Sequence, residues 1–143
     1  MIFKRISRTN PEVAYIVCKN VSGSTMTAGY SGVFDVGASA DGVRITQASS
    51  TDLQAYAGVA NADIANNDYG LVQVYGYRAS AYIYSSTGSS ASGDELTVVA
   101  AEWGLTPQAT SGDAKSFGFL CAAVAASSSS QFHTTAAVFI RAL

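Results

Sequence analysis

The sequence predicts an all-β protein, because short apolar segments rich in β-branched and aromatic residues follow one another closely, with Gly- and Ser-rich turns between them. Helical periodicity is nearly absent. A length of 143 residues suits one domain. We therefore expect a jelly-roll-like β-sandwich or barrel of about eight strands over residues 13–143. A short N-terminal arm, residues 1–12, precedes it.

Three strands are predicted in the first third of the chain. Residues 13–21 are apolar on both faces for most of their length. Residues 25–35 follow a Ser-Gly-Ser turn, and the glycines within and just after this segment predict a bent or bulged strand. Asp41-Gly42 is a turn signal, so residues 43–47 are expected to form the next strand.

The middle of the chain predicts extended structure with one glycine bend. Residues 53–64 mix aromatic and β-branched residues with alanines, which leaves helix and strand open, and we favour an extended segment. A turn over 66–70 precedes residues 71–84, which are expected to form a strand bent at Gly76. The Ser- and Gly-rich residues 85–93 predict a loop.

Further strands are predicted in the last third. Residues 94–100 enter one of them, and residues 103–107 are expected to lead into a loop. Residues 115–126 are apolar on both parities, as in a central strand buried on both faces. Their Ala-rich end, 122–126, also fits a helical turn. After a Ser run, residues 134–143 are expected to form a strand whose apolar centre should tie the end of the chain into a sheet.

Composition favours assembly with other protein surfaces. Charged residues make up 13% of the chain, against about 25% in an average soluble domain, and hydrophobic residues make up 48%. Ala, Ser, Gly and Thr must then cover much of the surface, and small neutral side chains pack closely against other copies or a partner. We predict a homo-oligomer, with a homotrimer preferred. The alternative is a monomer with a Ser- and Thr-rich exterior.

The charge distribution excludes one class of partner and singles out the arm. The net charge is −2, whereas a protein that binds duplex nucleic acid carries an excess of Lys and Arg, so no direct nucleic-acid binding is expected. Lys4, Arg5 and Arg8 are the exception, since they place three of the eight cations before Pro11. These residues are candidate contacts to an acidic neighbour. The alternative is a solvated chain end.

Targeting signals and cysteines point to an intracellular origin. The sequence has no secretory signal, and no apolar run approaches about 18 residues, so we expect synthesis in the cytoplasm and no membrane contact. Cys18 and Cys121 lie far apart on apolar stretches, outside any CxxC or His-containing cluster. We predict that both are reduced, structural thiols. The alternative is a disulfide between them, which would require their strands to be close neighbours.

No residue pattern predicts catalysis, a cofactor or a metal site. His133 is the only histidine, and we interpret it as a loop or strand-end residue. The ligand spacings of zinc and calcium sites are missing, as are the glycine patterns that bind nucleotides. Asp94, Glu95 and Glu102 form the closest carboxylate grouping, which serves glycoside hydrolysis only at a suitable separation. Asp94 fits better as a turn residue that accepts backbone amides. We expect no enzymatic activity.

A group of tyrosines is the remaining feature with a possible binding role. Tyr69, Tyr75, Tyr77, Tyr82 and Tyr84 fall within one short region. Tyrosine is favoured at interfaces and at sugar-binding surfaces, but it also suits a half-buried pleated sheet. We prefer packing or subunit contact, and carbohydrate recognition is the alternative.

Four short elements carry a family resemblance. They are AGVA at 57–60, DYGLVQVYG at 68–76, SGDEL at 92–96 and VFIRAL at 138–143. In this order they resemble elements of small phage capsid decoration, or cement, proteins, which stabilise the phage head. The resemblance covers the second half of the chain.

The resemblance implies a function. Such a protein is a virion component on the capsid exterior that stabilises an icosahedral phage capsid by bridging subunits of the major capsid protein, often as a trimer and without catalysis. Lys4, Arg5 and Arg8 would then be candidate capsid contacts. The alternative function is a receptor- or carbohydrate-binding β-module of a phage fibre, which would share the β-rich composition and the tyrosines. A small glycosidase would depend on the scattered carboxylates alone.

Overall fold

The computed structural model describes residues 12–37, 39–85, 88–108, 115–125 and 132–142. Within these ranges the chain forms nine β-strands and no helix, which confirms the predicted all-β class. Lys4, Arg5 and Arg8 lie outside the described residues, so the boundary and the role of the arm stay predictions.

The strands form one continuous mixed sheet. They are β1 (Ala14–Asn20), β2 (Ser31–Phe34), β3 (Arg44–Thr46), β4 (Tyr56–Ala60), β5 (Tyr69–Ser85), β6 (Glu95–Val98), β7 (Leu105–Pro107), β8 (Gly118–Leu120) and β9 (Phe132–Arg141). Their order in the sheet is β1-β3-β2-β4-β5-β7-β6-β8-β9. The β1–β3 and β5–β7 pairs are parallel and the other pairs are antiparallel. A jelly roll is not confirmed, since that fold places its strands in two opposed sheets.

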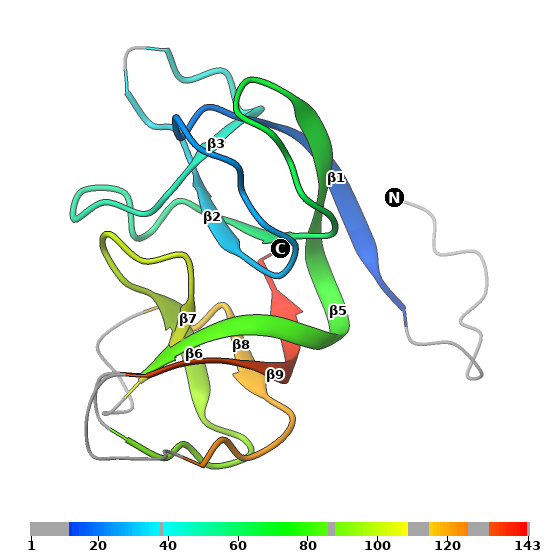
Figure 1. The fold of residues 1–143 in the computed structure, drawn as a ribbon, viewed down its shortest axis with the longest axis vertical. Coiled ribbons are helices and arrows are strands. Elements are labelled where there is room, and N and C mark those ends of the chain that lie inside the picture. Colours follow the sequence, from blue (N-terminus) through cyan, green and yellow to red (C-terminus); the bar gives the residue numbers. More distant parts are fainter. Residues whose placement is uncertain (1–11, 38, 86–87, 109–114, 126–131, 143) are drawn as a thin grey trace.

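Additional pairings of β5 close the sheet into two rings. Pairing with β1 closes a first ring of β1, β3, β2, β4 and the first half of β5. Pairing with β9 closes a second ring of the second half of β5, β7, β6, β8 and β9. In Figure 1 the blue-to-green strands of the first ring lie above the yellow-to-red strands of the second. The green β5 passes from the first ring into the second. Closure leaves few free strand edges.

The two rings repeat one connectivity. In each ring the first strand pairs in parallel with the third, and the second strand pairs antiparallel with the third and the fourth. The fifth strand pairs antiparallel with the fourth and the first. The second half of β5 therefore corresponds to β1, and β9 corresponds to the first half of β5. An isolated bridge also recurs, between Met26 and Ile64 in the first ring and between Ser90 and Val124 in the second.

Backbone hydrogen bonds align the two rings residue by residue. The Gly29 amide donates to the Ala60 carbonyl at 2.9 Å, and the Gly93 amide donates to the Leu120 carbonyl at 2.8 Å. Gly29 and Gly93 have φ values of 92° and 94°, which side-chain-bearing residues rarely adopt. The turn at Gly29 corrects the strand predicted over 25–35, because it separates an isolated bridge residue from the four-residue β2.

Each ring surrounds buried apolar side chains. The first-ring cluster contains Cys18, Met26, Ile45, Ala57, Ala60, Ile64 and Val72. The larger cluster contains Ile83, Leu96, Leu105, Leu120, Val138 and Ile140 in the second ring, together with Val33, Tyr56 and Val59 from β2 and β4. Because residues of both rings share the larger cluster, the two rings pack together. Burial of each such aliphatic side chain contributes about 1.5–3 kcal/mol of transfer free energy.

Several predicted elements agree with the structure, and three more besides 25–35 need correction. The bend within the 71–84 strand is confirmed, since β5 continues through Gly76 with φ at 101°. The strand predicted over 115–126 is wrong in length, because only β8 is a strand in the described part of this segment, and a bend at 121–122 separates it from the isolated bridge at Val124. Residues 53–64 are extended only along β4. Residues 103–107, expected to lead into a loop, include β7.

The buried Cys18 thiol predicts a loss of stability at high pH. Burial raises its pKa from 9.0 to about 11, so the folded state holds the proton more tightly than the unfolded state. This stabilisation is complete below pH 9 and is lost as the pH rises through 11. We expect the free energy of unfolding to fall by up to about 2–3 kcal/mol over this interval.

Urea unfolding at a series of pH values measures this effect, with Cys18→Ala as the test variant. The variant should start from a lower stability and should lose less between pH 9 and pH 11. Cys121→Ala is the comparison variant: burial also raises the pKa of the half-buried Cys121, so this variant should change the pH dependence less than Cys18→Ala does. Part of the loss should persist in Cys18→Ala because burial also raises the pKa of Tyr56. Equal slopes for the wild type and Cys18→Ala would contradict the assignment.

Candidate interaction surface

Large apolar side chains lie exposed along β1 and the first half of β5. Val17 pairs across the strands with Leu71, and Lys19 pairs with Tyr69. Val17 is 58% exposed, Leu71 47% and Tyr69 65%. We call this surface the β1–β5 face and define it by Val13, Tyr15, Val17, Lys19, Tyr69 and Leu71. Contiguous apolar surface of this kind on a folded protein often marks an interaction site.

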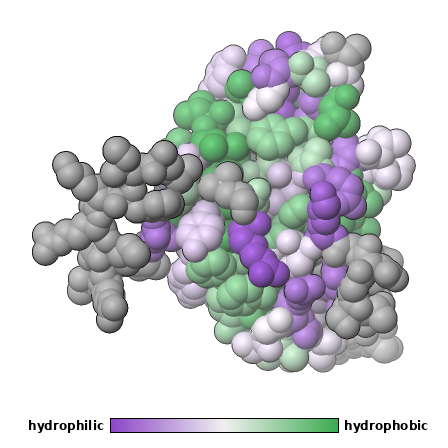
Figure 2. All heavy atoms as spheres, turned by 180° about the vertical axis from the view of Figure 1, so that it is seen from behind, coloured by the Kyte–Doolittle hydropathy of each residue, from purple (hydrophilic) through white to green (hydrophobic). Residues whose placement is uncertain are grey.

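Strand alternation places these residues outside. Successive side chains of a strand point to opposite faces, so Cys18 and Asn20 are buried in the first ring while Tyr15 and Val17 face outward. The sequence predicted this strand as apolar on both faces, and the structure shows that one of those faces is solvent-exposed. From behind, apolar residues form broad areas of the molecular surface, interrupted by polar side chains (Figure 2).

One cation belongs to the face. The Lys19 ammonium lies 5.9 Å from the centre of the Tyr69 ring, within the range of a cation–π contact. The face therefore combines apolar side chains, a phenol and a positive charge. Such a surface suits a protein partner that offers apolar side chains and carboxylates.

The second half of β5 carries a row of stacked aromatic rings. Neighbouring rings of the row lie close together, measured between ring centres. Trp103 stacks on Tyr30 at 5.5 Å, Tyr30 packs on Tyr82 at 5.0 Å, and Tyr82 stacks on His133 at 5.4 Å. His133 also contacts Tyr84 at 5.1 Å. The row connects the two rings, because Tyr30 precedes β2 whereas the other members belong to the second ring.

Backbone hydrogen bonds reinforce this connection between the rings. The amide and hydroxyl of Ser31 both donate to the Trp103 carbonyl, at 2.8 and 2.7 Å, and the Tyr82 amide donates to the Gly29 carbonyl at 2.9 Å. Burial, then Tyr30 and the charge of Glu102, raise the pKa of Tyr82. Since its aromatic side chains pack on one another, we interpret the row as a structural contact that holds the two rings of strands together.

The predicted tyrosine group is therefore divided by the structure. Tyr82 and Tyr84 belong to the aromatic row, and Tyr75 packs edge-on against Phe139 at 5.3 Å. Tyr69 and Tyr77 are exposed, and Tyr69 belongs to the β1–β5 face. The packing expected of the group holds for three of its members, and the exposed members leave an interaction role open.

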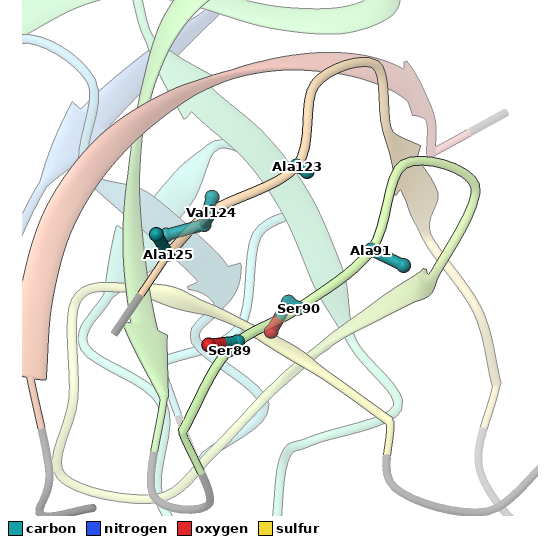
Figure 3. Close-up of a pocket in the computed structure, with 6 residues that line it drawn as sticks. All are labelled: Ser89, Ser90, Ala91, Ala123, Val124 and Ala125. Atoms are coloured by element: carbon teal, nitrogen blue, oxygen red, sulfur yellow. The ribbon is translucent and has the colours of Figure 1, made fainter. Parts of the chain in front are cut away.

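A shallow hollow lies beside the repeated bridge of the second ring. It has a volume of about 440 Å³ and is lined by Ser89, Ser90, Ala91, Ala123, Val124 and Ala125 (Figure 3). The bridge residues are buried in both rings, Met26 and Ile64 in the first and Ser90 and Val124 in the second. The described lining holds small and neutral side chains without an acid or base, so it offers no group for proton transfer.

The carboxylates singled out in the sequence have separate structural contacts. Asp94 accepts a hydrogen bond from the Ala91 amide at 2.8 Å, which confirms its predicted turn role. Glu95 forms an exposed ion pair with Arg141 at 3.4 Å. Among the described residues, no group of three or more His, Cys, Asp or Glu side chains is placed to hold a metal ion. No helix in the described part of the chain is long and apolar enough to cross a membrane.

The two cysteines lie in different rings. Cys18 is buried in the first-ring cluster, while Cys121 follows β8 and is half-buried. Both are free thiols in the structure. Burial also raises the pKa of Cys121, so neither thiol is activated toward nucleophilic chemistry.

Comparison with solved structures finds the same fold in a phage protein. The chain is similar to the head fibre gp8.5 N base of bacteriophage phi29, with a TM-score of 0.51 and 16% sequence identity. The match covers 92% of this chain and 96% of the phi29 chain. No protein-family model matches the sequence, and a search of curated proteins gave no match. At this identity the likeness establishes a shared fold.

Proposed function

We propose that this protein is a non-catalytic structural component on the exterior of a phage head, where it binds and stabilises the icosahedral capsid. The observation that carries the proposal is the shared fold with a head fibre base, which extends over nearly the whole of both chains. The decoration-protein elements at 57–60, 68–76, 92–96 and 138–143 support it independently.

In the finer form of the proposal, the protein bridges neighbouring subunits of the major capsid protein as a homotrimer. An exposed apolar face supports a contact with another protein surface. Lys4, Arg5 and Arg8 are proposed to add contacts to acidic groups of the capsid. Exposed ion pairs contribute about 0.2–1 kcal/mol each, so these cations would adjust binding that the apolar contacts dominate.

The comparison with the phi29 protein supports a second candidate function. That protein is the base of a head fibre, and this chain has a matching fold. The chain would then anchor a fibre on the head, or act as a receptor- or carbohydrate-binding part of it. Exposed Tyr69 and Tyr77 would suit such recognition.

Copy number in purified particles tests these functions. We expect a capsid-bridging protein to approach the abundance of the major capsid protein, because every local contact between capsid subunits offers it an equivalent site. Quantitative mass spectrometry with labelled peptide standards measures the ratio. A ratio tens of times lower would favour the fibre base. Absence of the chain from washed, intact particles would contradict both virion functions.

A further inference from the structure

We propose that Arg78 is the centre of a binding site for a carboxylate, with the hydroxyl groups of Tyr15 and Tyr56 beside it. The site lies where the two rings meet, because Tyr15 and Tyr56 belong to first-ring strands and Arg78 to the second half of β5. Three observations carry the proposal: a half-buried cation without an acid partner, a bulge that holds this cation, and a buried hydroxyl group without a hydrogen bond.

Arg78 differs from the other arginines that the structure describes. Arg44 forms an ion pair with Asp41 at 3.1 Å, and Arg141 forms one with Glu95 at 3.4 Å. Arg78 is half-buried, and none of the described acids forms an ion pair with it. Burial lowers its pKa because the charged form loses hydration, yet a guanidinium stays charged at neutral pH. The protein therefore holds a partly dehydrated positive charge that lacks a counter-ion within the described ranges.

The strand pairing directs Arg78 inward and fixes its position. Arg78 lies opposite Val138, which is fully buried, and opposite residues of an antiparallel pair share one face of the sheet. Directly after Arg78, two residues of β5 lie opposite one residue of β9, which is a bulge. The Arg78 Nε donates to the Ser80 carbonyl in this bulge at 2.8 Å. Its two Nη groups have no acceptor among the described residues, so they remain available to a ligand.

The Tyr56 hydroxyl is a second donor without an acceptor. Tyr56 is 5% exposed, and its ring stacks on Phe117 with 4.6 Å between the ring centres. Its hydroxyl oxygen is buried and forms no hydrogen bond, an arrangement that destabilises a folded protein. Burial raises the pKa of this phenol, and the charge of Arg78 lowers it, which places the two groups within electrostatic range. One acceptor between them would satisfy both.

Tyr15 connects this group of residues with solvent. It is 41% exposed, and its phenol interacts electrostatically with Arg78 as that of Tyr56 does. Glu12 is the described acid nearest to this end of β1 in the sequence, and its backbone carbonyl approaches Gly76. The Glu12 side chain is exposed and does not contribute to the charges that act on Arg78. A ligand from outside the described chain is therefore needed to neutralise Arg78.

A carboxylate matches the donors that are present. The planar guanidinium binds the two oxygens of a carboxylate through parallel hydrogen bonds, and a phenol can donate to either oxygen. One cation balances one carboxylate, whereas phosphate groups carry about two charges at neutral pH. A free organic acid and the Asp or Glu side chain of a partner protein share this chemistry.

The test is an NMR titration of the arginine Cζ and Nε signals with sodium acetate, at an ionic strength held constant with sodium chloride. We expect the Arg78 signals to move along a saturating curve. Arg44 and Arg141 are internal controls, because their ion pairs already occupy them, and their signals should move little. A parallel titration with N-acetylglutamic acid amide distinguishes the sources. Tighter binding of this compound than of acetate would favour a protein side chain, and equal or weaker binding would favour a free organic acid.

Two variants test the roles of the donors. Arg78→Lys keeps the charge but removes the paired Nη groups, so it should bind acetate about tenfold more weakly, as expected for the loss of a hydrogen bond between charged groups. Tyr56→Phe should also weaken acetate binding, although in chloride alone it should be at least as stable as the wild type. A hydroxyl that only supported the fold would instead lower stability when removed. Arg44→Lys is the matched control and should bind like the wild type.

Several results would overturn the proposal. Arg78 signals that respond to acetate no more than those of Arg44, or that respond equally to chloride, would show that no carboxylate site exists. Wild-type affinity in Tyr56→Phe would remove the hydroxyl from the site. Thermal unfolding checks that each variant folds, and the wild-type titration decides the matter even if Arg78→Lys does not fold. The titration uses the free protein, so its failure would leave the proposed virion function intact.

Discussion

Ile45→Ala and Leu105→Ala should each lower the free energy of unfolding by about 2–5 kcal/mol, and both should shift a single cooperative transition. The two side chains are buried at corresponding strands, Ile45 in the first ring and Leu105 in the second. Each substitution removes contacts within a packed interior and leaves a cavity. The rings should unfold together because β5 supplies a strand to both.

Urea unfolding followed by far-ultraviolet circular dichroism and by Trp103 fluorescence measures this coupling. Trp103 is the only tryptophan and lies at the joint between the rings. Val43→Ala is the control, since Val43 is exposed beside β3, and it should change stability by less than about 1 kcal/mol. Two separate transitions, each moved by only one core variant, would show that the rings unfold independently.

The local structure of this chain was accessible from its sequence. The strands near β1, β5 and β9 were predicted from apolar runs and from a glycine bend, because these signals depend on neighbouring residues. The segment after β8 was overpredicted because its alanines and Cys121 are compatible with strand, turn or helix. Only the exposure of Ala122 and Ala123 in the fold resolves that choice.

The arrangement of the strands was not accessible in the same way. The two rings depend on which strands pair across long separations, and parallel pairs such as β1–β3 leave no local pattern. The repeat is marked in the sequence by scattered positions such as Gly29 with Gly93 and Gly58 with Gly118. Those pairs have different spacings, so a search at one fixed period would not find them.

The candidate site was predicted in part. Tyr69 was recognised as a candidate interface residue, and the apolar character of both faces of residues 13–21 was read from their alternation. Which face is solvent-exposed depends on how the first ring closes, so Val17 and Leu71 were not singled out. Lys4, Arg5 and Arg8 lie outside the described residues, and their contribution stays a prediction.

Gly58→Ala is expected to reduce the free energy of unfolding by about 2–5 kcal/mol, through a steric overlap added to backbone strain. Gly58 lies in β4 with φ at 140°, and a Cβ there would overlap the Gln73 carbonyl oxygen and lie 2.8 Å from the Val72 side chain. Because β4 pairs with β5 at these residues, the backbone cannot move away without loss of ladder hydrogen bonds.

Two further glycine variants separate the steric overlap from the strain. A Cβ at Gly118, the corresponding residue of β8, would overlap the Phe139 carbonyl oxygen without a positive φ, so Gly118→Ala should cost about 1–3 kcal/mol through overlap. Gly23 has φ at 86° and open space around it, so Gly23→Ala should cost about 1–2 kcal/mol through strain.

Urea unfolding of the three variants compares their losses of stability directly. If Gly58→Ala is no more destabilising than Gly23→Ala, the close approach of β4 to β5 does not limit the residue at this position. If Gly58→Ala matches the sum of the other two losses, overlap and strain act independently, and close strand approach is a shared requirement of both rings.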